Sequence, residues 1–184
     1  MKLASYTATH SGFSGIFNRA IRWRFGGSFF KDGQASHTEV VFMPGDGVDH
    51  LMPDGNCAPV LGAYWCASSS ALDIMPAWSS RRVGKKGGVR FKRIVLDPNK
   101  WEIADYNHDP VYAAEWFRRH QGLPYDWSTI TGYLSMPLDI LIGFSDYRWM
   151  CSAACAAAGG YSRADLFHPE LLRLINRNHE LLMK

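Results

Sequence analysis

The apolar and polar positions of this chain divide it into short strands between helices. Residues 36–43 (SHTEVVFM) alternate through β-branched side chains, which predicts a strand with His37, Glu39 and Val41 on one face. Proline, glycine and aspartate predict turns after this strand. Similar patterns place further strands at residues 48–52, 63–67, 89–96 and 101–104, turns at 43–47 and 53–55, and an exposed loop at 81–88.

Helices are expected on both sides of these strands. Asp109 and Pro110 are a typical N-cap and first residue for a helix that runs to Gln121. Apolar residues at helical spacing, and glycine pairs at helix ends, indicate the others. The expected helices cover residues 14–25, 110–121, 151–158 and the tail from 169 on. This order of elements predicts an α+β fold.

Composition narrows the class of protein. The chain has 184 residues, 47% of them hydrophobic and 20% charged, with no internal repeat or low-complexity linker, which predicts a single domain over 1–184. A net charge of +3 gives no argument for specific nucleic-acid binding. Four cysteines in this length do not resemble a disulfide scaffold. The N-terminus lacks the apolar core of a signal peptide and no stretch reaches transmembrane length, so synthesis in the cytoplasm is expected.

The sharpest chemical signal is Cys151, which lies in RWMCSAACAAAGG (148–160) at the start of an expected helix. A helix N-terminus favours the thiolate, the nucleophilic form of cysteine, through its dipole and its free backbone N–H groups. His37 is the candidate base, because a Cys–His pair requires contact in space and not in sequence. Each residue also has a plainer interpretation. Cys151, like Cys155, could be a small buried helix residue, and His37 could be a hydrogen-bonded core histidine.

Two further groups of residues carry weaker signals. The four cysteines (57, 66, 151 and 155) lack the C-x₂-C pairs typical of zinc sites, so we expect neither a metal nor a cofactor. Seven basic residues lie between 81 and 93 with no acidic residue among them, which is typical of a solvated loop or of contact with an anionic polymer. These residues are Arg81, Arg82, Lys85, Lys86, Arg90, Lys92 and Arg93.

SHTEVVF, followed much later by WMCSAACAAAG, resembles the circularly permuted NlpC/P60 (papain-like) cysteine hydrolases. This group includes the YiiX/YaeF-like hydrolases and, more distantly, the lecithin:retinol acyltransferase-like proteins. Its members have a His-bearing strand before a Cys at the start of a helix, the reverse of the papain order. GGVRFKRI (87–94), GLPYDW (122–127) and ADLFHPELL (164–172) resemble further segments of the group in the right order, the first of them common in phage-encoded members.

The resemblance implies a permuted papain-like fold, in which a small antiparallel sheet or half-barrel packs against helices. It makes Cys151 the nucleophile and His37 the base. Members often read Cys-Ser-Glu at the helix start, where this chain has Ala153. We expect Glu39, on the same strand face as His37, to orient the imidazole, although Glu39 could instead pair with a nearby arginine. The orienting group would then be Asp49, His50 or a serine of 68–70.

Tyr125 and Ser152 are the expected substrate-binding residues, with simple packing as the alternative for Tyr125. The implied reaction is cleavage of an amide bond, and the implied substrate is the stem peptide of peptidoglycan. A phage setting is also implied, in a virion tail or in lysis, with other tail proteins as partners and action in the periplasm. Two rival functions stay open: an acyltransferase or lipid thioesterase on the same scaffold, and a catalytically silent virion component that only binds.

Overall fold

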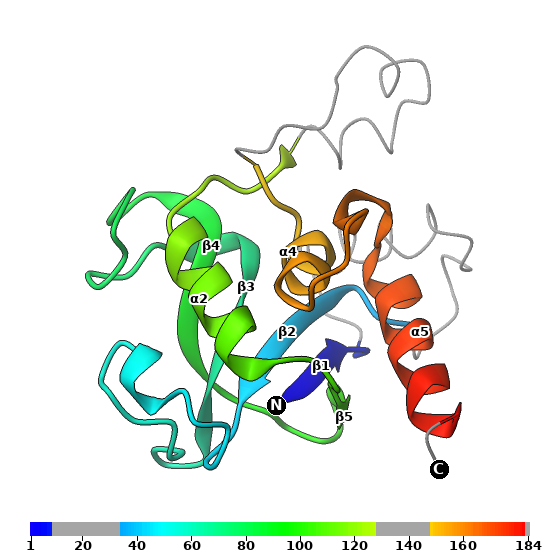
Figure 1. Ribbon diagram of the computed structural model, residues 1–184. Helices are drawn as coiled ribbons and strands as arrows, with labels where there is room; N and C mark the ends of the chain where they lie inside the picture. Colours follow the sequence, from blue (N-terminus) through cyan, green and yellow to red (C-terminus); the bar gives the residue numbers. More distant parts are fainter. Residues whose placement is uncertain (9–33, 128–147, 183–184) are drawn as a thin grey trace, which may run out of the picture.

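The computed structural model describes residues 1–8, 34–127 and 148–182, and the remaining segments are drawn as a grey trace (Figure 1). The expected helix at 14–25 lies outside the described residues. Within the described part of the chain, no helix is long and apolar enough to cross a membrane. That residues 1–184 form one domain stays a prediction.

A five-stranded antiparallel sheet forms the centre of the fold. Its strands lie in the order β4-β3-β2-β1-β5, so the first strand of the chain is inserted between β2 and β5. The predicted α+β class and small antiparallel sheet are therefore confirmed. The strands are β1 (Lys2–Tyr6), β2 (His37–Phe42), β3 (Ala63–Ile74), β4 (Lys86–Val95) and β5 (Trp101–Asp105).

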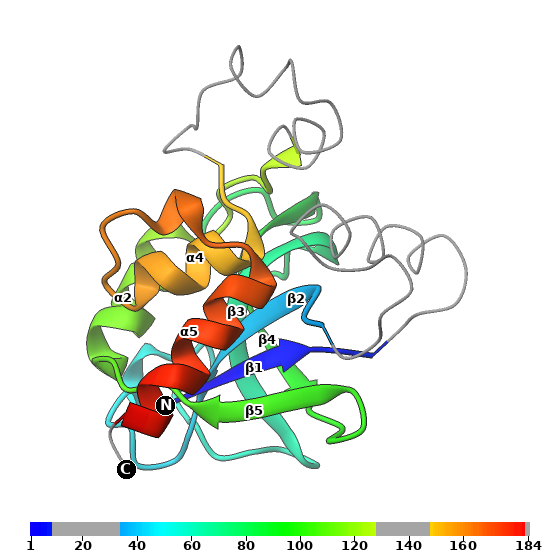
Figure 2. The same ribbon diagram turned by 90° about the vertical axis from the view of Figure 1, so that its right-hand side faces the viewer.

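Among the described residues, three helices cover one face of this sheet, with α4 between α2 and α5 (Figure 2). The Asp109 carboxylate caps α2 by accepting from the N–H groups of Val111 and Tyr112, as its sequence position predicts. Val40 and Phe42 of β2 meet the helices in the main core. The helices α2 (Pro110–His120), α4 (Cys151–Ala158) and α5 (Pro169–Leu182) confirm three predictions, and a short 3-10 turn, η2 (Ala164–Leu166), links α4 to α5.

Two strand predictions need correction. The expected strand at 48–52 is wrong, because η1 (Asp49–Leu51) is a 3-10 turn in which the Leu51 N–H donates to the Val48 carbonyl. The Asp49 carboxylate accepts from the Cys57 N–H at 2.8 Å and stabilises this turn against an extended form. In contrast, β3 extends well past residue 67, because its serines pair with β4 and bind neighbouring backbone groups.

The strands β2 and β3 pair only where Val40–Phe42 faces Trp65–Ala67, and they separate beyond that point. The Ser68 hydroxyl donates to the Thr38 carbonyl at 2.7 Å and replaces a ladder hydrogen bond there. The helix α4 meets both strands at this split, where Cys155 Sγ lies 3.5 Å from the Thr38 carbonyl. Every residue of α4 is buried, and its small side chains allow the close approach. The separation of the two strands thus admits the helix that begins with Cys151.

The end of α4 is fixed by a buried contact that can be tested. The Tyr106 hydroxyl donates to the Cys155 carbonyl at 2.9 Å, and a Cβ added at Gly159 would overlap that hydroxyl. We expect Gly159→Ala to destabilise the protein by about 1–3 kcal/mol, the usual cost of overpacking. The free energy of unfolding in urea measures this. Adding Tyr106→Phe should recover part of the loss, and strictly additive effects of the two changes would contradict the overlap.

Candidate active site

Cys151 is the first residue of α4, preceded by Met150 in an extended conformation. Its thiol interacts with the His37 ring and with the backbone N–H groups of Thr38 and Ser152, and these interactions lower the pKa of the thiol. The Thr38 N–H is available because β2 has left β3 at this point. The helix N-terminus and the strand split therefore deliver donors to the same sulfur, which favours the thiolate.

His37 is the first residue of β2 and connects the sulfur to a carboxylate. Its Nε2 lies 2.7 Å from Glu39 Oε1, which leaves Nδ1 as the ring nitrogen that can exchange a proton with Cys151. The ring also packs edge-on against Trp101. The His37 side chain is 26% exposed whereas Glu39 is fully buried, so the centre opens to solvent on the side of the imidazole.

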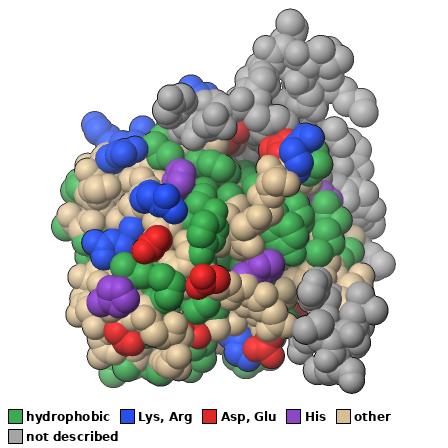
Figure 3. Space-filling model, viewed as in Figure 1, with side chains coloured by type: hydrophobic (Ala, Val, Ile, Leu, Met, Phe, Trp, Pro, Cys, Tyr) green, Lys and Arg blue, Asp and Glu red, His purple; other side chains and the backbone are tan. Residues whose placement is uncertain are grey.

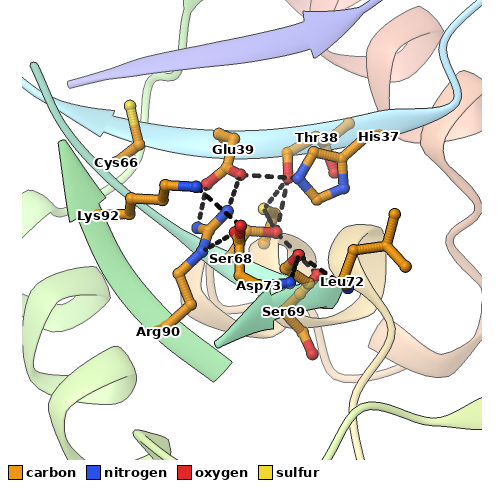
Figure 4. A network of polar contacts seen from close by, with 12 residues as sticks. His37, Thr38, Glu39, Cys66, Ser68, Ser69, Leu72, Asp73, Arg90 and Lys92 are labelled. Carbon is orange, nitrogen blue, oxygen red and sulfur yellow. Dashed lines mark hydrogen bonds and ion pairs between the residues drawn. The ribbon is translucent and has the colours of Figure 1, made fainter. Parts of the chain in front are cut away.

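Glu39 makes both of the contacts that the sequence suggested, with His37 and with an arginine. Residues two apart on a strand have Cα atoms roughly 6.5–7 Å apart, but the His37 and Glu39 side chains are long enough to converge. The same carboxylate accepts two hydrogen bonds from Arg90, from Nη1 at 2.7 Å and from Nη2 at 2.6 Å. Figure 4 shows Glu39 between the imidazole and the guanidinium.

Charges of alternating sign set the protonation of this centre. Burial favours the neutral forms of all three groups, but their neighbours outweigh it. The Arg90 guanidinium, followed by His37, lowers the pKa of Glu39 to about 2. The negative charges of Cys151 and Glu39 raise the pKa of His37 to about 10, and His37 in turn lowers the pKa of the Cys151 thiol. Both shifts favour a thiolate paired with an imidazolium.

The alternative orienting groups are engaged elsewhere. The Asp49 carboxylate binds the Cys57 N–H, and His50 lies in the same 3-10 turn. Ser69 donates to the Trp149 carbonyl at 2.6 Å, and the Ser70 hydroxyl accepts from the N–H groups that follow it. Of the candidates considered from sequence, Glu39 is the one that the structure brings to His37.

The two expected substrate-binding residues lie beside Cys151 but differ in their contacts. Tyr125 is almost fully buried and packs in a small cluster with Ala71, Met150 and Cys151. The Ser152 hydroxyl donates to the Phe167 carbonyl at 2.6 Å in a fully buried position, so this side chain links α4 to the segment before α5. The part of Ser152 that reaches the sulfur is its backbone N–H.

The basic cluster at 81–93 divides into two parts. Arg90, Lys92 and Arg93 belong to β4 and pair with carboxylates distant in sequence, namely Glu39, Asp73 and Asp54. The loop proper ends at 85, because β4 begins at Lys86. Basic side chains gather on the side of the molecule where α2 and this loop lie (Figure 3). Arg90 was not expected at the site, because alternation within each strand does not reveal an ion pair between side chains of β2 and β4, which are not neighbours in the sheet.

Within the described ranges there is no cluster of three or more His, Cys, Asp or Glu side chains that could hold a metal ion. The four cysteines are all free and buried. In comparisons with known proteins, no family model matches the chain, and neither a curated protein nor a solved structure is detectably similar to it.

The charge arrangement makes one cysteine more reactive than the others. Burial raises the pKa of Cys57 to about 11 and also raises the pKa values of Cys66 and Cys155. We therefore expect iodoacetamide to label Cys151 first and below about pH 8.5, where an ordinary thiol titrates. Labelling should slow as the pH falls through the lowered pKa of Cys151, because the thiolate regains its proton. Peptide mass spectrometry of time points gives the four rates, and equal rates would contradict a tuned nucleophile.

Proposed function

We propose that the protein is a cysteine hydrolase with Cys151 as nucleophile, His37 as general base and acid, and Glu39 as the group that orients the imidazole. The observation that carries this proposal is the contact of Cys151, at the start of α4, with an imidazole whose far nitrogen is held by a buried carboxylate. Covalent acyl transfer requires a nucleophile in contact with a base, and a base that is held in turn by an orienting group. A silent binding component has no need of this arrangement.

The reaction would proceed through a thioester. The Cys151 thiolate attacks the carbonyl carbon, and the carbonyl π electrons move to the oxygen, where backbone N–H groups at the start of α4 can stabilise the negative charge. As the tetrahedral intermediate collapses, the C–N bond breaks and the His37 imidazolium gives its proton to the leaving amine. Neutral His37 then takes a proton from water, whose oxygen attacks the thioester and releases the acid and the thiolate.

We infer a circularly permuted papain-like fold for this centre. The histidine strand β2 precedes the cysteine helix α4 in the chain, and α4 packs against the sheet that carries the histidine. Both features agree with the order of motifs in the NlpC/P60 resemblance. The same resemblance leads us to propose peptidoglycan stem peptides as the substrate, in a phage tail or lytic setting with action in the periplasm.

An acyl ester or thioester is the second candidate substrate, and one observation favours it. Leu72 is 53% exposed and Trp127 is 44% exposed. The cluster around Cys151 contains Ala71 and Tyr125. Leu72 is the next residue after Ala71, and Trp127 packs against Tyr125. Exposed apolar side chains at this edge of the site suit an acyl chain better than a charged peptide.

Hydrolysis of peptidoglycan tests the proposal. Purified protein should release new amino groups from Gram-negative sacculi, and Cys151→Ser and His37→Ala should abolish this release. Glu39→Gln should slow it by about a hundredfold or more, because the imidazolium loses its counter-charge. Cys57→Ser is the matched control, since Cys57 is also buried but lies beside Asp49, and it should keep full activity.

A parallel assay separates the two candidate substrates. The same variants are offered a fatty-acyl ester and isolated muropeptides. Cleavage of the ester alone would replace the peptide substrate with the acyl one. If no substrate is cleaved, or if Cys151→Ser is as active as the wild type, the assignment as a cysteine hydrolase falls.

A further inference from the structure

We propose that Arg90 is a positioning residue of the catalytic centre, which acts through Glu39 by holding that carboxylate charged and correctly oriented toward His37. The inference rests on the proposed function and deepens it. It adds to the site a residue on β4, a strand that carries neither the nucleophile, the base nor the orienting carboxylate.

The Arg90 fork reaches its target across an intervening strand. Arg90 pairs in register with Ser68 of β3, whereas Glu39 lies on β2, beyond β3. The Ser68 side chain is small and fully buried, so the guanidinium has room to pass over β3 and reach β2 at the point where β2 and β3 separate. Because Nη1 and Nη2 each meet one carboxylate oxygen, the fork fixes the plane of the Glu39 carboxylate and not only its position.

A second carboxylate holds the other side of the guanidinium. Arg90 Nε donates to Asp73 Oδ2 at 2.8 Å, and Lys92 Nζ lies 2.7 Å from Asp73 Oδ1. Negative and positive groups therefore alternate along a single line of contacts, much of which is visible in Figure 4. The members of this line are, in order, Cys151, His37, Glu39, Arg90, Asp73 and Lys92. This line runs from the reacting sulfur to solvent, since the Lys92 side chain is 51% exposed.

Burial gives Arg90 a role beyond joining strands. The Arg90 side chain is 3% exposed and Glu39 is fully buried, so the charge on Glu39 depends on its partners and not on water. Without Arg90, the desolvated carboxylate would lose its stronger cationic partner, so the pKa of Glu39 would rise and a neutral carboxyl beside a neutral imidazole would be favoured relative to the ion pair. The Cys151 thiolate would then have a weaker counter-charge. The removal of Arg90 should therefore be detectable at a sulfur that Arg90 does not touch.

Arg93 provides a matched control on the same strand. Its Nη2 lies 2.7 Å from Asp54 Oδ2 in a similar ion pair, but this pair is partly exposed. The Arg93 guanidinium also lies over the ring of Trp65. Arg93→Gln removes a guanidinium and an ion pair from β4 without altering the line of charges to Cys151. Its effect therefore measures the structural contribution of a β4 arginine.

The test measures the rate of iodoacetamide labelling of Cys151 against pH, which requires no substrate, together with the free energy of unfolding. We expect Arg90→Gln to raise the midpoint of this profile by about one pH unit or more, a tenfold change in the thiol–thiolate equilibrium. Arg90→Lys keeps the charge and loses the fork, and should raise the midpoint by less. Arg93→Gln should leave the midpoint at the wild-type value. In a Glu39→Gln background, Arg90→Gln should add no further shift, because Arg90 acts through Glu39.

The outcomes separate this proposal from the proposed function. An unchanged midpoint in Arg90→Lys and Arg90→Gln, with any loss of stability, would make Arg90 a structural residue and overturn the inference while the hydrolase assignment stands. If Arg90→Gln does not fold, the Arg90→Lys midpoint decides. A full additional shift in the Glu39→Gln background would also overturn it. A wild-type midpoint near the ordinary thiol value of about 8.5 would refute both proposals, since there would be no tuned thiolate to support.

Discussion

The buried carboxylate of Glu39 is the group on which the rest of this structure depends. A charge removed from water must be paired, and Glu39 is paired on both sides, with His37 at 2.7 Å and with the Arg90 fork at 2.6 and 2.7 Å. Loss of one partner from such a buried pair typically costs about 3–5 kcal/mol, so the contact is maintained wherever the protein is folded. Since the partners come from β2 and β4, the same carboxylate joins side chains of these two strands and contacts the imidazole.

The helix α4 supplies the other half of the arrangement. It reaches the sheet because β2 pairs with β3 only from Val40 to Phe42, and because its side chains are small enough to pack where the two strands separate. Its first residue then meets the imidazole, and the Thr38 N–H, released from the ladder, points at the sulfur. The geometry of the proposed catalytic centre therefore follows from an interruption in strand pairing, which is filled by a helix of alanine, serine and cysteine.

Local chemistry in the sequence was sufficient for most of the elements. The Asp109-Pro110 cap, the Gly159-Gly160 end of α4 and the alternation around His37 each depend on neighbouring residues, and each was predicted correctly. Strand alternation also placed Glu39 beside His37. The errors arise where distant segments decide the outcome: Asp49 stabilises a turn through Cys57, and the serines of β3 are satisfied by Thr38 and Trp149. Arg90 was predicted in a strand but was grouped with the basic residues 81–93, as part of a solvated loop or of a contact with an anionic polymer, because its carboxylate partners come from β2 and β3.

The central claim is that Cys151 and His37 form a thiolate–imidazolium pair, and the ultraviolet absorbance of the thiolate tests it most directly. The difference in absorbance between the wild type and Cys151→Ser is followed as the pH rises from about 4 to about 10. The account predicts one step below about pH 8.5, the value of an ordinary thiol, and its displacement upward in His37→Gln, where the cation is absent. A step at the ordinary thiol value in the wild type, unchanged in His37→Gln, would contradict the account.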